Sequence, residues 1–158
     1  QRLARDEKGV DITVLLLAII VMAIYSVLNI ASAYYPIDMG LLDLQQQARQ
    51  SMEWISNEAR QSSSKAGKIT ITPVSADVDS ITFTTPTKTG INYYLSGTQL
   101  LRVYPAGTAP RIIARDITRL KFTFINKILT IDLRAEKTVR KKPLSLEVKQ
   151  KVRVRNED

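Results

Sequence analysis

A long apolar run begins at Ile12, after a short charged segment, and continues without a charged residue to Ala33. The run holds 22 residues, and as a helix that rises about 1.5 Å per residue it reaches roughly 33 Å. The hydrocarbon core of a bilayer is about 30 Å thick, so the run is long enough to cross it. We therefore expect a membrane-spanning helix over residues 10–35, with Tyr34 and Tyr35 at the membrane–water boundary.

Two other interpretations of this run are open. Ala31-Ser32-Ala33 has the small residues of a signal-peptide cleavage site, although the apolar core of a signal peptide is usually only about 7–15 residues long. A buried helix of a water-soluble protein is the other alternative, but uncharged runs of this length are uncommon in such cores. The length of the run favours the membrane helix over both.

Beyond Pro36, apolar residues recur every three or four positions, which is the spacing of one helix face. That face consists of Leu41, Leu44, Ala48, Met52, Ile55 and Ala59, and the opposite face of Gln46, Arg49, Gln50, Glu53, Asn57 and Arg60. Pro36 lacks a backbone donor and disfavours helical dihedrals at Tyr35, so it predicts a kink rather than an end. An amphipathic helix is expected over residues 36–64. We expect its apolar face to pack on the protein's own sheet. Contact of this face with neighbouring subunits is the less favoured alternative.

After Lys68 the apolar positions alternate with polar ones, which is typical of strands with one buried face. The expected strands cover residues 68–72, 80–84, 91–95, 99–104, 120–124, 129–135 and 144–154. Ser96-Gly97-Thr98 and Asn126-Lys127 are expected turns, and residues 138–142 an expected basic loop. Together these elements predict an α+β fold: a long N-terminal helix, half membrane-spanning and half amphipathic, packed on an antiparallel sheet of about four to seven strands within a β domain over 65–158.

Composition argues against catalysis. The chain has no Cys and no His, which removes thiol chemistry, disulfides, imidazole acid–base catalysis and the usual zinc sites. It also lacks phosphate loops, dinucleotide fingerprints and nucleophile elbows. Asp77-Val78-Asp79 is too little of a calcium loop to predict one and is expected to be a solvated loop. We expect no enzyme activity, no cofactor and no metal.

The net charge of +8 arises in the last third of the chain. Residues 111–158 hold fourteen Lys and Arg against six acids, whereas residues 1–110 hold nine of each. The candidate anion-binding residues are Arg140, Lys141, Lys142, Lys149, Lys151, Arg153 and Arg155. Nucleic acid, anionic lipid or an acidic partner would suit them. Solubility and protection of a strand edge are favoured instead, because no aromatic platform accompanies the charges.

The order of these features resembles the type IV pilin and type II secretion pseudopilin family. The resemblance lies in Lys8-Gly9-Val10 ahead of an apolar helix, in Pro36, and in an amphipathic extension followed by a β domain. Residues 44–60 and 89–97 are most similar to minor pilins and minor pseudopilins. The resemblance implies that residues 1–9 are a leader, that prepilin peptidase cuts between Gly9 and Val10, and that the new amino terminus is methylated.

The position that usually holds Glu in this family, five residues after the cleavage Gly, is Val14 here. In the family this Glu neutralises a neighbouring subunit's terminal amine inside the apolar filament core, where an unpaired charge is costly. Asp11 is the nearby acid that could replace it. Three explanations stay open: Asp11 takes the role, the subunit sits at a filament tip where no amine needs neutralising, or the leader is retained.

The resemblance implies a structural subunit of a type IV pilus or secretion pseudopilus. Such a subunit waits in the inner membrane as a single-pass protein, with its amino terminus in the cytoplasm and its β domain outside. It then joins a periplasmic or cell-surface filament. Its expected partners are other pilin or pseudopilin subunits, the inner-membrane assembly platform and prepilin peptidase. The alternative is a non-polymerising envelope protein whose basic β domain binds an anionic ligand or partner. DNA capture by the basic terminus is a specialisation of either.

Overall fold

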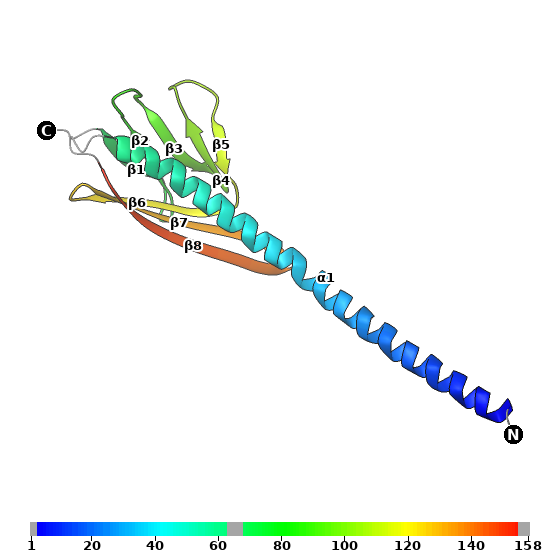
Figure 1. Cartoon of the computed structure of the whole chain (residues 1–158). Coiled ribbons are helices and arrows are strands. Elements are labelled where there is room, and N and C mark those ends of the chain that lie inside the picture. Colours follow the sequence, from blue (N-terminus) through cyan, green and yellow to red (C-terminus); the bar gives the residue numbers. More distant parts are fainter. Residues whose placement is uncertain (1–2, 63–67, 155–158) are drawn as a thin grey trace. The chain divides into compact units, whose positions relative to one another are not determined.

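The computed structural model describes residues 3–62 and 68–154, with side chains from residue 12 onward. Within these residues one helix precedes eight strands (Figure 1). They are α1 (Leu3–Gln61), β1 (Ile69–Pro73), β2 (Asp79–Phe83), β3 (Ile91–Ser96), β4 (Gln99–Val103), β5 (Arg111–Ala114), β6 (Ile117–Ile125), β7 (Ile128–Val139) and β8 (Lys142–Arg153). Two compact units follow one another along the chain, Gln1–Met39 and Gly40–Asp158.

α1 does not end at Pro36, because Leu3–Gln61 is one continuous helix with this proline inside it. The kink expected at Pro36 stays a prediction. α1 ends at Gln61, three residues before the predicted boundary at residue 64, and Ser62 donates its backbone N–H to the Glu58 and Ala59 carbonyls at 3.0 and 3.2 Å. The expected apolar face is confirmed as the buried one, since Leu44, Ala48, Met52, Ile55 and Ala59 are buried. Only Leu41 of that set stays exposed, at 37 %.

The strands of the second unit form two antiparallel sheets. One contains β1 to β5 in that order and the other contains β6, β7 and β8. The predicted α+β fold, a long N-terminal helix on antiparallel β structure, is confirmed, but the strands form two sheets rather than the single sheet of four to seven strands that the sequence predicted. The sheets separate at Arg115 and Asp116, where the left-handed φ of 61° at Asp116 turns the chain out of β5 and into β6. β5 was not predicted, because its four residues follow a proline-rich loop and are too short for a clear alternation.

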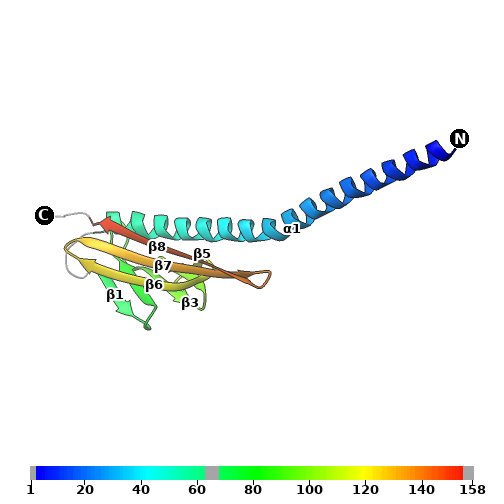
Figure 2. The same cartoon turned by 90° about the horizontal axis from the view of Figure 1, so that it is seen from below.

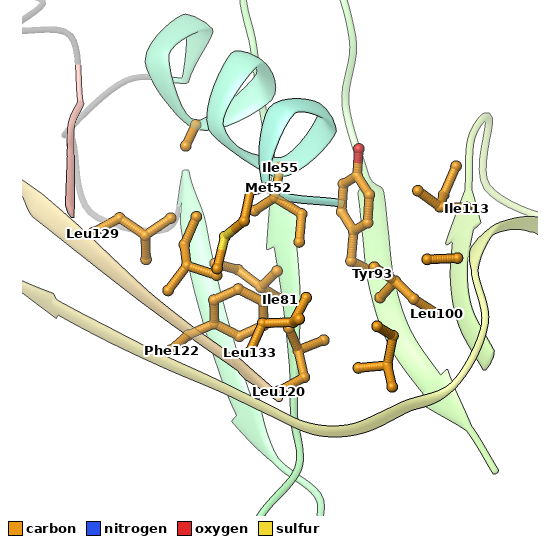
Figure 3. Close-up of a cluster of buried hydrophobic side chains, with 14 of the residues drawn as sticks. Met52, Ile55, Ile81, Tyr93, Leu100, Ile113, Leu120, Phe122, Leu129 and Leu133 are labelled. Atoms are coloured by element: carbon orange, nitrogen blue, oxygen red, sulfur yellow. The ribbon is translucent and has the colours of Figure 1, made fainter. Parts of the chain in front are cut away.

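The core of the second unit lies between α1 and both sheets. Figure 3 shows Met52 and Ile55 of α1 pointing toward Phe122, Leu129 and Leu133 of the three-stranded sheet. Tyr93, Leu100 and Ile113 of the five-stranded sheet belong to the same buried cluster. The six polar residues predicted for the opposite helix face are all exposed. The helix therefore stabilises the unit by covering apolar side chains from both sheets at once.

Asp79 joins the two sheets and is not the solvated residue that the sequence predicted. Its side chain is buried, and its carboxylate accepts the Phe122 backbone N–H and the Lys121 ammonium, each at 2.9 Å. Beside it, the Leu120 N–H donates to the Asp77 carbonyl at 3.0 Å, and Val78 forms a parallel bridge with Leu120. These contacts join the start of β2, together with the two residues before it, to β6 in the other sheet.

We expect Asp79→Ala to lower the free energy of unfolding by about 1–3 kcal/mol, because a buried backbone donor at Phe122 loses its acceptor. Chemical denaturation of the detergent-solubilised full chain measures this. Asp77→Ala is the matched control, since the Asp77 side chain is 70 % exposed and reaches β6 through a 3.5 Å surface ion pair with Arg119, while its backbone carbonyl, which the substitution keeps, accepts the Leu120 N–H. Equal stability of the two variants would contradict this role of the Asp79 carboxylate.

β7 and β8 are longer than the sequence predicted and join through a two-residue turn. The expected loop over 138–142 was wrong, because the strand pairing continues to Val139 opposite Lys142. Arg140 and Lys141 form the turn with φ values of 48° and 66°, the left-handed pair of a tight hairpin. The turn end of this hairpin packs on the helix at Gly40. Figure 2 shows β7 and β8 running alongside the second half of α1. A Cβ at Gly40 would lie 2.8 Å from Val139 Cγ2 and 3.0 Å from Leu144 Cδ1, so the approach depends on glycine.

Candidate functional site

The first candidate site is the apolar part of α1. Every residue from 12 to 35 is exposed, including Met22 at 71 % and Tyr25 at 66 %. This is the one helix of the described residues that is long and apolar enough to cross a membrane. Two serines of this segment donate hydrogen bonds to backbone carbonyls of the same helix: Ser26 Oγ to the Met22 carbonyl at 2.8 Å and Ser32 Oγ to the Asn29 carbonyl at 2.9 Å. Such internal bonding suits surroundings without water.

The residues expected for leader processing lie at the amino-terminal end of α1. Gly9, Val10 and Asp11 belong to the helical backbone, while their side chains fall outside the described residues. Val14 is described and is 59 % exposed. Cleavage between Gly9 and Val10, and the role of Asp11, stay predictions.

The second candidate site is the set of basic residues in the last third of the chain, and the structure divides it into two groups. Arg140, Lys141 and Lys142 are exposed at the β7–β8 turn. Lys149, Lys151 and Arg153 are exposed toward the other end of β8, which for a strand of this length lies about 35 Å from the turn. Arg155 lies outside the described residues. The basic set is therefore two small patches rather than one surface.

The patch formed by Lys149, Lys151 and Arg153 lies on the sheet face that points away from the core. Lys149 is 3.9 Å from Asp132 on β7, whereas Lys151 and Arg153 form no ion pair with any carboxylate in the described part of the chain. Arg153 is paired across the sheet with Ile128, which is paired with Ile125, and both isoleucines are exposed. No aromatic residue belongs to these three strands on that face, so the patch offers charge without a stacking surface.

A third cluster was missed by the sequence analysis and surrounds Glu58 on α1. The Tyr93 hydroxyl donates to Glu58 Oε2 at 2.6 Å, and Arg102 donates through both Nε, at 3.1 Å, and Nη2 to Oε1. Burial raises the pKa of Tyr93, and the Glu58 carboxylate raises it further. Burial by itself would lower the pKa of Arg102, but the hydrogen bond and charge of Glu58 outweigh it and raise the pKa. The three groups form a buried, charge-compensated network.

Aromatic rings extend this network toward the surface. The Arg102 guanidinium lies 5.5 Å from the centres of both the Trp54 and Tyr104 rings, Arg111 lies 5.6 Å from Trp54, and Lys88 lies 5.5 Å from Tyr104. Such distances permit cation–π attraction. A hollow of about 350 Å³ opens beside them, lined by Glu53, Trp54, Asn57, Glu58, Gln61 and Lys88. Acids and bases both line this hollow, so its charge does not select one class of ligand.

The signal for the Glu58 cluster was present but ambiguous in the sequence. Glu58 follows the apolar residue Ile55 by three positions, which places it beside the buried face of the helix. Arg102 and Tyr93 lie on neighbouring strands and are paired across them. The pairing of a helix residue with two strand residues depends on how the helix lies on the sheet, and hydrophobic spacing alone does not define this.

An ion pair near the β7–β8 turn gives a pH prediction. Lys137 Nζ lies 2.6 Å from Asp43 Oδ2 on α1, and its hydrogen bond lowers the pKa of Asp43 below 3.8. Because the folded pKa is depressed, the stabilisation is present above pH 3.8 and is lost as the pH falls through the folded value. Asp43→Asn should therefore lower the free energy of unfolding by no more than about 1 kcal/mol at neutral pH, since both side chains are partly exposed.

Urea unfolding of the full chain in detergent over a range of pH values tests this. The difference in the free energy of unfolding between Asp43→Asn and the unchanged chain should shrink to nothing in strong acid. Gln46→Asn, an exposed change one turn away that adds no titrating group, should show no such pattern. A difference that persists in strong acid would mean that Asp43 acts through packing rather than charge.

No family model matches the chain, and neither a curated protein nor a solved structure shows a significant similarity to it. What the fold shares with the pilin-like layout is one long N-terminal helix whose second half packs on antiparallel sheets.

Proposed function

We propose that this chain is a non-enzymatic structural subunit, of the minor pilin or minor pseudopilin kind, that waits in the inner membrane and assembles through its apolar helix into a pilus or secretion pseudopilus. The same helix serves in both states. In the membrane it contacts lipid, and in the filament it contacts the apolar helices of neighbouring subunits. The second unit is carried outside, where its surface determines neighbours or cargo.

One observation carries the proposal. The residues from 12 to 35 are all exposed, whereas the continuation of the same helix, from Leu44 to Ala59, supplies the core of a folded unit. A stretch of this length without charge needs an apolar environment that the described chain does not supply. A bilayer satisfies that need for a single copy, and a bundle of copies satisfies it after assembly.

The location of the chain tests the proposal. A full-length chain with an epitope tag in the exposed turn between β3 and β4, at Gly97 and Thr98, is expressed in its native cell. We expect the tag in the carbonate-washed inner membrane and in filaments sheared from the cells or trapped with the secretion system. The same tag between Arg49 and Gln50 is unsuitable, because it would interrupt the helix that holds the core.

The outcome also distinguishes the proposed filament subunit from the alternative, a non-polymerising envelope protein. A chain found only as a monomer in membranes would contradict assembly and favour a single-pass envelope protein, whose ligand surface would be the patch at Lys151 and Arg153. A chain absent from membranes and filaments alike would contradict both functions.

Mass spectrometry of the native amino terminus tests the processing step separately. A methylated terminus at Val10 is the expected result. A terminus at Gln1 or earlier would contradict processing by prepilin peptidase, and a chain with such a terminus would carry Arg2, Arg5, Asp6, Glu7 and Lys8 ahead of the apolar helix. Those five charges are difficult to place inside an apolar filament core.

A further inference from the structure

We propose that the β7–β8 turn, through Arg140, Lys141 and Lys142, binds the anionic phosphate headgroups of the membrane in which the apolar segment is held. The inference deepens the proposed function, since it rests on membrane insertion of residues 12–35. It concerns the state before assembly and names its ligand class as anionic lipid. The sequence alone predicted a basic loop and a basic strand face, and assigned no separate ligand to either.

The turn is fixed to the start of the second unit. Val139 and Leu144, the residues on either side of it, pack on Gly40, where an added Cβ would approach them to 2.8 and 3.0 Å. The ion pair of Lys137 with Asp43 holds the same end of the hairpin one helical turn later. Both contacts lie within the unit Gly40–Asp158. The basic turn therefore stays beside Gly40 whatever direction the apolar segment takes.

Chain length then limits the distance between this turn and the end of the apolar segment. Gly40 follows Tyr35 by five residues, which span roughly 7.5 Å as a helix and at most about 18 Å when fully extended. The polar headgroup layer on each side of a bilayer is several ångströms thick. If Tyr35 marks the membrane boundary, the long side chains at the turn lie within reach of the headgroups.

The chemistry of the turn fits phosphate headgroups better than other anions. Three consecutive basic side chains are exposed on a tight turn, and polybasic segments beside a membrane helix are attracted to anionic lipid. Asp43 and Asp116, which lie in the same unit as the turn, both contact Lys137. No aromatic residue lies between Thr138 and Leu146, so stacking with nucleic acid bases has no platform here.

Lys149, Lys151 and Arg153 provide a matched comparison. They carry the same charge as the turn residues, but they lie about 23 to 36 Å along β8 from Lys142 at the turn. If lipid binding depends on position, neutralising the turn residues should weaken it and neutralising the other three should not. A general electrostatic attraction would be weakened equally by both triple variants, since each removes three positive charges.

The experiment measures how close the turn lies to lipid headgroups. The full chain has no Cys, so Thr138→Cys gives a single site for a fluorophore beside the turn, and Thr123→Cys gives one toward the other end of the sheet. Each labelled chain is reconstituted in vesicles of phosphatidylcholine alone or with phosphatidylglycerol, containing a lipid whose headgroup carries a short-range nitroxide quencher. We expect strong quenching of the label at residue 138 in the vesicles with phosphatidylglycerol, weakened by salt, and little quenching at residue 123.

The triple variant Arg140→Gln, Lys141→Gln, Lys142→Gln should remove this quenching. At about fivefold per basic residue, the association of the turn with anionic headgroups should weaken roughly a hundredfold. The triple variant Lys149→Gln, Lys151→Gln, Arg153→Gln should leave it unchanged. Circular dichroism spectra and melting of both variants verify that each remains folded.

The possible contrary results are distinct. Equal quenching with and without phosphatidylglycerol, or an equal loss in both triple variants, would overturn the inference while leaving membrane insertion intact. Extraction of the unchanged chain from the vesicles by carbonate would instead contradict the proposed function, on which the inference rests.

Discussion

Glu58→Gln is expected to lower the free energy of unfolding by about 3–5 kcal/mol, the cost of breaking a buried ion pair from one side. The Glu58 and Arg102 side chains are only 7 % and 11 % exposed. The substitution leaves the guanidinium of Arg102 buried without a counter-charge, and it offers the Tyr93 hydroxyl and Arg102 a single neutral acceptor in place of a carboxylate. Denaturant unfolding monitored by Trp54 fluorescence measures the loss, because Trp54 contacts Arg102 directly.

Three further variants test whether the negative charge of Glu58 is the source of its stabilisation. Glu53→Gln makes the same chemical change on an exposed position of α1 and should alter stability by less than about 0.5 kcal/mol. Tyr93→Phe should cost less than Glu58→Gln, because it removes one neutral donor and leaves the ion pair. Adding Arg102→Leu to Glu58→Gln should recover part of the loss by removing the unpaired charge. A double variant less stable than Glu58→Gln alone would contradict the buried-charge explanation.

Ile24→Arg is expected to reduce insertion of the chain into the membrane by roughly a hundredfold, since an arginine near the middle of a membrane helix costs about 2.5–3.5 kcal/mol. Ile24 lies close to the centre of residues 12–35 and is 55 % exposed, so the folded second unit should be unaffected. Extraction of the chain from membranes by carbonate measures the effect. Because membrane residence precedes assembly in the proposed function, filaments should also lack this variant.

Leu16→Lys separates membrane residence from assembly. Leu16 lies near the amino-terminal end of the apolar run, where a lysine can extend its ammonium group to the membrane surface. We therefore expect this variant to remain in the membrane but to be excluded from filaments, whose helix core has no water for the charge. Gln46→Lys, on the exposed polar face of α1, is the control and should enter filaments normally. Normal assembly of Leu16→Lys would contradict a filament contact at this position.

Local patterns predicted most of the secondary structure. The threefold and fourfold spacing from Leu44 to Ala59 identified the buried helix face, because that face repeats within a single element. The alternation of apolar and polar residues likewise identified β7 and β8, because it also repeats within a single element, and Leu129, Leu133 and Val152 are all buried. The separation into two sheets was not predictable in this way, since it depends on the backbone conformation at Asp116 and on a contact between Asp79 and Phe122 from distant parts of the chain.

The candidate sites, too, were predictable where the signal is local in the sequence and not where it depends on distant residues. The sequence predicted one long apolar helix from its own length and lack of charge, and the structure shows residues 12–35 in such a helix with all of them exposed. The basic residues were identified as a loop and a strand face, but the tight turn at Arg140 and Lys141 and the distance along β8 to Arg153 required the strand pairing from Val139 to Ile128. The Glu58 network was missed because its members, Tyr93 and Arg102, are 35 and 44 residues away from Glu58 in sequence.

The burial of Val152 and Val154 has a consequence for the order of biogenesis. Val152 lies on β8, which follows every other strand, and the Val154 N–H donates to the carbonyl of Lys127 at 2.9 Å in the turn before β7. The helix face from Leu44 to Ala59 emerges far earlier in synthesis and cannot be fully covered until these valines arrive. We therefore expect the second unit to remain open until its last strand is available and to close in one late step.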